Sequence, residues 1–213
     1  MNEIYLTGCT HYGHFNIIRY CNRPFKTLEE MDKILIRNTN ERVKDNNILY
    51  HLGDFCFKNS PGGKKGEGSL NRADYYLNQI NSPVIVVAGN HDSNNGLRTK
   101  NQRIIIHYAG IYFQLIHNPA EAIVRDDKYY YPCILHSHVH TAWAEKEMID
   151  KNGNVSLLIN CGVDVRKFRP ISMKEVMVIF HRWLNSRPDK SRIKTLIHET
   201  NKGLKIYRRN RNV

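Results

Sequence analysis

The fold class of this chain is decided by the stretch Pro83-Val84-Ile85-Val86-Val87-Ala88-Gly89-Asn90-His91-Asp92. Its first six residues form an apolar run, which predicts a buried strand. Polar residues follow at once, and Gly89 allows the backbone to turn sharply there. A buried parallel strand ends at the carboxyl edge of its sheet, where open α/β folds collect their ligands. Asn90 can offer an oxygen atom to a metal ion, and His91 can offer an imidazole to a proton or an anion.

The first half of the chain alternates apolar strands with helical segments, and the second half is rich in strands. Strands are predicted at 4–7 and 48–52, helices at 15–21, 27–43 and 70–80, and β-rich runs at 103–107, 111–116, 129–135 and 155–161. A further helix is predicted at 172–184, because Ser172 and Glu175 have the spacing of a capping box, as do Thr27 and Glu30. This order predicts an α/β fold in which two sheets pack face to face with helices outside.

The composition is that of a globular protein, with 41% hydrophobic and 24% charged residues. A length of 213 residues allows one well-buried core, so we expect a single folded domain. No apolar run approaches the ~20 residues needed to span a bilayer, and residues 1–6 lack the pattern of a signal peptide. The five cysteines form no C-x-x-C pair, which favours free thiols in a reducing cytoplasm over a disulfide scaffold.

Positive charge is concentrated near the C-terminus. The formal net charge is +12, and residues 181–213 hold ten Lys or Arg against two acidic residues, a net of +8. We therefore expect a domain over residues 1–185 followed by a basic extension over 186–213. Such an extension can bind nucleic acid through its phosphates, and the plainer alternatives are a solvated segment or the exposed face of the last helix.

Five predicted strand ends carry side chains suited to metal binding or acid–base chemistry. They are Cys9 with His11, Asp54, Asn90 with His91, His117, and His138 with His140. Ligands drawn from separate strand ends are how a two-metal site is built. Oxygen donors mixed with imidazoles suit Mn, Fe, Zn or Ni better than Mg or Ca. Each of these residues alone has an ordinary structural explanation, but all of them follow an apolar run and adjoin a turn residue.

These motifs resemble those of the calcineurin-like metallophosphoesterases, whose pattern is D-x-H, G-D, G-N-H-[DE], H and G-H-x-H. The corresponding segments here are Cys9-Thr10-His11, Gly53-Asp54, Gly89-Asn90-His91-Asp92, His117 and Ser137-His138-Val139-His140. The order and spacing agree, and the segments 11–18 and 160–165 are similar to a small bacterial and phage branch of the family. The resemblance covers about residues 4–184 and leaves the basic extension outside.

The resemblance implies a four-layer α/β/β/α sandwich with two divalent transition metal ions at one edge of the sheets. The first ion would be held by Cys9, His11, Asp54 and His140. The second would be held by Asp54, Asn90, His117 and His138, so that Asp54 bridges the pair.

The resemblance also assigns roles toward a phosphate-ester substrate. His91 would lie beside the scissile phosphate as general acid or charge stabiliser, and His14 would contact the phosphate. Arg98, Lys64 and Lys65 are candidates for contacts with the rest of the substrate.

Two residues depart from the family pattern. Cys9 stands where the family has Asp, and a thiolate is a softer and larger metal ligand than a carboxylate. Ser137 stands where the family has Gly, which matters if that backbone requires positive φ.

Three functional hypotheses follow from these observations. The first is a metal-dependent phosphoesterase that acts on a phosphodiester or a small nucleotide-type substrate. The second is a pseudoenzyme that binds a nucleotide or a protein but turns over slowly because of Cys9. The third is a nuclease or nucleic-acid-binding protein that uses the basic extension. The sequence indicates no membrane partner and does not indicate an oligomeric state.

Overall fold

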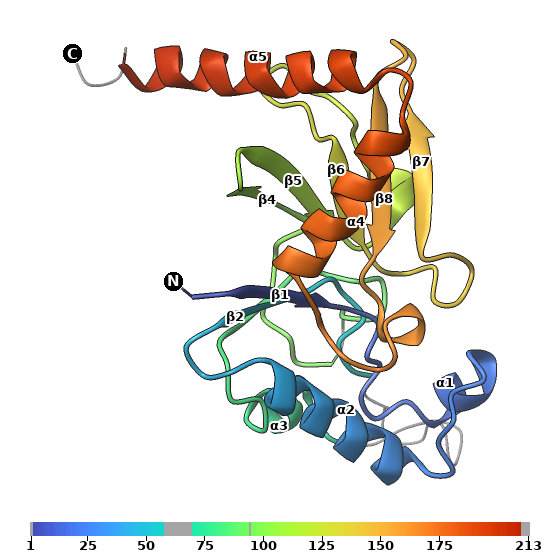
Figure 1. The fold of residues 1–213 in the computed structure, drawn as a ribbon. Helices are drawn as coiled ribbons and strands as arrows, with labels where there is room; N and C mark the ends of the chain where they lie inside the picture. Colours follow the sequence, from blue (N-terminus) through green and yellow to red (C-terminus); the bar gives the residue numbers. More distant parts are fainter. Residues whose placement is uncertain (1, 58–69, 94, 210–213) are drawn as a thin grey trace.

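Two mixed β-sheets form the centre of the molecule (Figure 1). The computed structural model describes residues 2–57, 70–93 and 95–209, with side chains as far as Lys202. The first sheet has the order β3-β2-β1-β9, with β1 (Ile4–Thr7), β2 (Ile48–His51), β3 (Val84–Val86) and β9 (Ile171–Ser172). The second has the order β4-β5-β6-β8-β7, with β4 (Arg103–Tyr108), β5 (Ile111–Ile116), β6 (Cys133–His136), β7 (Glu145–Ile149) and β8 (Val155–Asn160). The predicted pair of mixed sheets flanked by helices is confirmed.

Parallel pairing places the predicted strand ends together. β1 pairs with β2 and β2 with β3, all parallel, and β9 joins β1 in the antiparallel sense. In the second sheet β5, β6 and β8 are parallel, while β4 and β7 are antiparallel edge strands. Because parallel strands end on the same side of a sheet, the loops after β1, β2, β3, β5 and β6 gather at one edge.

The helices cover both ends of this arrangement. They are α1 (Phe15–Tyr20), α2 (Leu28–Arg42), α3 (Ala73–Leu77), α4 (Met173–Ser186) and α5 (Lys190–Arg209), with short 3₁₀ turns at Pro119–Glu121 and Val163–Val165. In Figure 1, α2 and α3 lie on the far side of β1 and β2 from the second sheet, and α4 leads from the first sheet up to α5.

The main hydrophobic core lies between the two sheets. Leu6 and Leu52 contribute from the first sheet, and Phe113 and Leu135 from the second, all of them fully buried. The α4 side chain Phe180 joins the same cluster. A second cluster packs Met31, Leu35 and Tyr76 of α2 and α3 against Tyr12 and Phe55 of the strand-end loops. The loops that carry the polar motifs are therefore held between packed apolar layers.

The helix starts follow the predicted caps. Ser172 and Glu175 form a complete capping box at α4. At α2 the Thr27 hydroxyl accepts the Glu30 N–H, but the Glu30 carboxylate accepts the N–H of Lys26, one residue before the cap. The box at α2 is thus shifted by one residue and both helices still begin where the spacing predicts.

Several elements differ from the sequence prediction: β9 and α5 were not predicted, and two further differences concern α3 and β7. The predicted helix over 70–80 is shortened to α3, and β7 was not predicted at all, because Glu145-Lys146-Glu147 lacks the apolar alternation of a strand. Tertiary contacts explain β7: it pairs with β8, and Glu147 accepts hydrogen bonds from Trp183 and Arg187 near the end of α4. Charged side chains are usual on an edge strand.

The basic extension contains α5, which is anchored to the domain. Ile193 is buried in the main core, and the Asn201 side chain donates to the Gly110 carbonyl at 2.8 Å. The boundary predicted after residue 185 and nucleic-acid binding by the extension both stay predictions. Within the described residues, no helix combines the length and apolar character needed to cross a membrane.

The carboxylate of Asp32 generates a prediction about pH. Both of its oxygens accept the Gly13 N–H at 3.1 Å, and burial between α2 and α3 raises its pKa to about 7. The unfolded carboxyl, with a pKa of about 3.9, loses its proton first, so the native state binds more protons and stability falls as pH rises from about 4 to about 7. The Asp32→Asn variant should therefore become more stable than wild type, by roughly 2 kcal/mol at pH 8, with the gain shrinking toward pH 5.

Urea denaturation at pH 5 and pH 8 measures this difference. Asp45→Asn, an exposed change just beyond α2, is the matched control and should leave the pH dependence unaltered. An Asp32→Asn variant whose stability tracked wild type at both pH values would contradict the prediction.

Candidate metal centre

Eight side chains predicted for the site lie on five loops at one edge of the sheets. The loop after β1 carries Cys9 and His11, and the loop after β2 carries Asp54. The loops after β3, β5 and β6 carry Asn90 and His91, then His117, then His138 and His140. The structure therefore brings together all of the predicted metal ligands, although their roles stay predictions.

The β1 and β2 loops run side by side past the ends of their strands. The Cys9 N–H donates to the Gly53 carbonyl at 2.9 Å, and the His11 N–H donates to the Asp54 carbonyl at 3.1 Å. Gly53 has φ of +86°, and a Cβ there would lie 2.4 Å from His117 Nδ1. A Cβ on Gly89 would lie 2.2 Å from the Asp54 backbone nitrogen. Gly89 is thus required by close approach to a neighbouring loop rather than by a left-handed turn.

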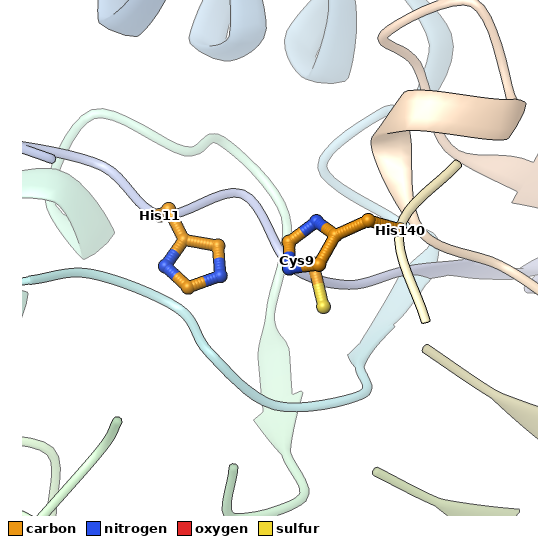
Figure 2. A group of neighbouring side chains, drawn as sticks. All are labelled: Cys9, His11 and His140. Atoms are coloured by element: carbon orange, nitrogen blue, oxygen red, sulfur yellow. The ribbon is translucent and has the colours of Figure 1, made fainter. Parts of the chain in front are cut away.

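One group of donors is formed by Cys9, His11 and His140, whose candidate ligand atoms all lie within 4.8 Å of one another. Figure 2 shows the three side chains next to one another, two from the β1 loop and one from the loop after β6. Soft sulfur beside two imidazoles is a donor set typical of zinc and other transition metals.

A second group adjoins the first through Asp54. The ligand atoms of Cys9, Asp54 and His117 also lie within 4.8 Å of one another. Asp54 Oδ2 is 3.4 Å from His11 Nε2 and 3.4 Å from His117 Nε2, so one carboxylate oxygen lies between the two groups. His117 Nε2 is 3.0 Å from Asn90 Oδ1 and 3.1 Å from His138 Nδ1. This is the arrangement that a bridging Asp54 would require.

The backbone at these positions is held in the left-handed region. Positive φ is found at Cys9 (49°), His11 (52°), Asp54 (55°), His138 (70°) and His140 (46°). Each such conformation in a non-glycine residue costs on the order of 1–3 kcal/mol and persists only where surrounding structure imposes it. Strain of this kind collects at functional sites, and here it falls on the predicted ligands.

Burial keeps several of the imidazoles neutral. It lowers the pKa of His11 well below its ordinary value, lowers the pKa of His14 to about 4, and lowers the pKa of His138. A neutral imidazole has the free lone pair that metal binding needs. Burial also acts on His117 and His140, but it is outweighed. The nearby Asp54 carboxylate raises the pKa of His117, and the hydrogen bond to Asp164 raises the pKa of His140 to about 9.

Cys9 is fully buried, and its environment favours the thiol. Burial and the nearby Asp54 carboxylate raise its pKa far above the ordinary value. The His138 N–H lies 3.0 Å from Cys9 Sγ and donates to it. A cation at this point would favour the thiolate instead, since metal binding and proton release are linked.

The residues present fit a metal ion. His11 Nε2 is buried and has no hydrogen-bond partner among the described residues, which is costly for a ring nitrogen unless another ligand satisfies it. The same atom points toward Asp54 Oδ2 at a distance longer than a hydrogen bond of good geometry. A buried, uncommitted nitrogen among a thiol, a carboxylate and two further imidazoles is what a transition-metal site provides.

The predicted substrate-side residues differ in placement. His91 is exposed, its N–H donates to Asp54 Oδ1 at 2.9 Å, and its ring centroid lies 5.5 Å from that of His11. His14 is buried, with Nδ1 at 3.5 Å from His11 Nδ1. Both therefore adjoin the metal groups. Among the described residues, no hydrogen bond or ion pair links Arg98 to them, and Lys64 and Lys65 lie outside the described residues.

Asp92 supports the site in a way that sequence reasoning missed. Its buried carboxylate accepts the backbone N–H groups of Asp54, Phe55 and Gly89, together with the Asn95 side chain. It joins the β3 loop to the β2 loop and fixes the backbone of the predicted bridging ligand.

Asp164 and Arg23 form a second support. Asp164 Oδ2 is 2.8 Å from His140 Nδ1, and the same carboxylate binds the buried Arg23 guanidinium. Arg23 also donates to the carbonyls of Cys9 and Thr10. Carboxylates that bind the second nitrogen of a ligand histidine orient its ring. The segment 160–165 already carried part of the family resemblance, which was the available signal for Asp164.

The backbone at position 137 does not need the glycine that is found there in the family pattern, because Ser137 can adopt its conformation. It is absent from the described residues with positive φ, and its hydroxyl donates to the Leu52 carbonyl. The same oxygen lies 3.1 Å from His117 Nδ1, which is also 2.8 Å from the Leu52 carbonyl. Ser137 therefore helps to hold the orientation of His117.

The four hydrogen bonds of Asp92 generate a stability prediction. Replacing Asp92 with Asn keeps the shape of the side chain but exchanges one acceptor oxygen for an amide that faces backbone donors. The variant should lose about 1–3 kcal/mol of unfolding free energy, because a buried donor is left without its partner.

Urea denaturation of Asp92→Asn, beside Asp127→Asn as an exposed control, measures this loss. Manganese binding should weaken about ten- to a hundredfold in Asp92→Asn, since residues that orient ligands have effects of this size. Equal stability of Asp92→Asn and wild type would show that the carboxylate does not hold the two loops together.

Known proteins resemble this chain in sequence and in fold. The family model described as calcineurin-like phosphoesterase matches residues 3–208. The uncharacterized protein MJ1445 of Methanocaldococcus jannaschii is 32% identical over 182 residues, which cover 85% of this chain and 93% of that protein. A solved structure, the protein of unknown function AQ665 from Aquifex aeolicus, is similar with a TM-score of 0.59 at 22% sequence identity. The match covers 84% of this chain and 100% of that chain, and it supports the fold alone. On the family model and the curated relative, this chain belongs to the calcineurin-like phosphoesterase family.

Proposed function

We propose that this protein hydrolyses phosphate esters, with a phosphodiester or nucleotide-type compound as its substrate and a metal-activated water as nucleophile. The observation that carries the proposal is the position of Asp54 Oδ2, which lies 3.4 Å from His11 Nε2 on one side and from His117 Nε2 on the other. Family membership supports metal-dependent phosphoester hydrolysis in general.

Two divalent transition ions (Mn, Fe, Zn or Ni) would be held by the residues of the two groups. Cys9, His11, Asp54 and His140 would hold the first, and Asp54, Asn90, His117 and His138 the second. When bound, the ions supply a water of lowered pKa and positive charge against the phosphate oxygens. The chain supplies the fixed geometry, through the hydrogen bonds of Asp92, Asp164 and Ser137 to the ligand loops.

His91 would transfer a proton to the leaving oxygen. In support, its backbone is fixed by the hydrogen bond to Asp54 Oδ1, and the residue is exposed to solvent. An imidazole in that position can donate a proton to the departing alkoxide. Buried His14 beside it presents a neutral imidazole toward the phosphate, since burial lowers its pKa to about 4.

The space beside the second group suits a small substrate. A cavity of about 240 Å³ adjoins the predicted ligands Asn90, His117 and His138. Its wall is completed by Gln102, Asn118 and Glu121 together with apolar side chains. Amide and carboxylate groups can hydrogen-bond a sugar or a base, which supports a nucleotide-type ester over a protein substrate.

Hydrolysis of bis(4-nitrophenyl) phosphate by the purified full chain with added Mn²⁺ tests the proposal. We expect turnover that is abolished by a chelator and restored by Mn²⁺. With a substrate whose leaving group is an alkoxide, such as a nucleotide phosphodiester, kcat of His91→Asn should fall by about 10²- to 10⁴-fold with the metal content unchanged, as for loss of a general acid. The nitrophenyl ester should be affected less, because its leaving group needs no proton. His107→Asn, an exposed histidine on β4, should behave as wild type. Full activity in His91→Asn would remove that residue from the mechanism.

A weakened enzyme is the second candidate, and the burial of the Cys9 thiol favours it. The raised pKa of this thiol means that metal binding must overcome the cost of forming a buried thiolate beside Asp54. A carboxylate at position 9 would ionise far more readily.

The Cys9→Asp variant separates the two candidates. If the thiol limits the first metal, Cys9→Asp should bind Mn²⁺ about tenfold more tightly and raise kcat/KM, on the scale of other changes at metal ligands. Metal content and turnover are measured together, with the buried Cys133→Ala as the control for loss of a thiol. Two metals and full turnover in wild type would exclude the weakened enzyme.

A further inference from the structure

A group of aromatic side chains borders the candidate metal centre on one side. The rings of His14 and Phe57 are stacked, with centroids 4.3 Å apart and an angle of 17° between their planes. Tyr20 meets His14 edge-on at 6.2 Å, and His91 meets Phe57 edge-on at 6.3 Å. We call these four residues, His14, Tyr20, Phe57 and His91, the aromatic rim.

Unlike a cluster in the hydrophobic core, the aromatic rim is partly exposed to solvent. The side chain of Tyr20, the last residue of α1, is 64% exposed. Phe57 is half-buried and His91 is exposed, while His14 below them is buried. An exposed tyrosine of this kind contributes little to stability, since its ring stays largely in water. Much of the Tyr20 ring is therefore open to a ligand, and the Arg19 guanidinium lies over the ring.

The aromatic rim adjoins the predicted metal ligands through His11. His14 Nδ1 is 3.5 Å from His11 Nδ1, and the ring centroids of His91 and His11 are 5.5 Å apart. His91 is also the residue proposed to protonate the leaving oxygen. A group attached to that oxygen would therefore lie over the rim, not over the two donor groups.

The chemistry of the rim selects planar rings. Aromatic side chains stack on nucleobases and other flat aromatic groups, whichever base is present. The guanidinium of Arg19 lies 5.6 Å from the centre of the Tyr20 ring, which adds a planar cation to the same surface. By contrast, the cavity beside Asn90, His117 and His138 is completed by Gln102, Asn118 and Glu121, and none of the described residues that line it is Phe, Tyr or Trp. The two sides of the site thus offer different contacts.

We propose that the aromatic rim binds a planar aromatic ring on the leaving side of the phosphate ester, with a nucleobase as the ring, and that Tyr20 supplies the stacking face. This inference rests on the proposed function, because it places the ring relative to His91. It adds the class of leaving group, which phosphoester hydrolysis alone does not specify.

Equilibrium binding to the full chain in Mn²⁺ buffer tests the proposal without requiring turnover. The probes are adenosine 5′-monophosphate and ribose 5-phosphate, which share the sugar and the phosphate and differ by the base. Titration calorimetry should show adenosine 5′-monophosphate binding about five- to a hundredfold more tightly, the range expected for one base stacked on an aromatic side chain.

Variants of Tyr20 assign the difference to the rim. Tyr20→Ala should bring the two affinities close together by weakening only the nucleotide, while Tyr20→Phe should keep the preference. Tyr75→Ala is the matched control, since Tyr75 on α3 is 52% exposed and lies outside the rim. Equal affinities of the two probes in wild type, an unchanged preference in Tyr20→Ala, or no binding of either probe at millimolar concentration would each overturn the proposal.

A second arm distinguishes a nucleobase from any aryl group. Phenyl phosphate and cyclohexyl phosphate are compared as competing ligands in the same titration. A preference for phenyl that is lost in Tyr20→Ala supports stacking of a flat ring in general. If adenosine 5′-monophosphate binds more tightly than ribose 5-phosphate but phenyl phosphate binds no more tightly than cyclohexyl phosphate, stacking on the rim requires the larger ring system of a base. These titrations measure binding only, so an absence of hydrolysis would count against the proposed function and not against the rim.

Discussion

The site depends on one buried carboxylate held between two sets of imidazoles. Asp54 Oδ2 lies at 3.4 Å from a ring nitrogen of His11 and at the same distance from one of His117, while Oδ1 accepts the His91 N–H. The interaction with His117 holds the pKa of the Asp54 carboxyl far below its ordinary value despite burial. A charged group in this position must be compensated on every side, and the surrounding loops are arranged to do so.

Compensation begins with the backbone. Asp92 on the β3 loop accepts the Asp54 N–H, and a Cβ at Gly89 would strike that same nitrogen, so the two loops approach as closely as glycine allows. Five predicted ligands have left-handed backbone conformations, which cost free energy. The packing of the apolar layers on both sides offsets that cost. One layer lies between the sheets and the other lies under α2 and α3.

The buried ion pair of Arg23 and Asp164 extends this framework to the other group. Arg23 binds the Cys9 and Thr10 carbonyls, and Asp164 binds His140. One network therefore positions ligands that are about 130 residues apart in sequence, in the loops after β1 and β6. Within this frame the predicted ligand Cys9 presents a buried sulfur atom to the first group. Beyond that frame, the mouth of the site is aromatic near α1 and polar near β5, so the two ends of a bound ester would meet different surfaces.

The sequence by itself determined the strand ends, the α4 capping box and the family, because each depends on residues close together in the chain. An apolar run followed by Gly, Asn or Asp marks a strand and its end wherever it occurs. Five such signals in the order found in the family leave few alternative folds. Tertiary structure alone decided the features that join distant segments. The β7 strand pairs with β8, and its Glu147 accepts hydrogen bonds from Trp183 and Arg187. The Asp92 carboxylate accepts a backbone N–H 38 residues away. The aromatic rim likewise unites α1, the β2 loop and the β3 loop. Such contacts leave no local pattern, since only the folded chain brings their partners within a few ångströms of one another.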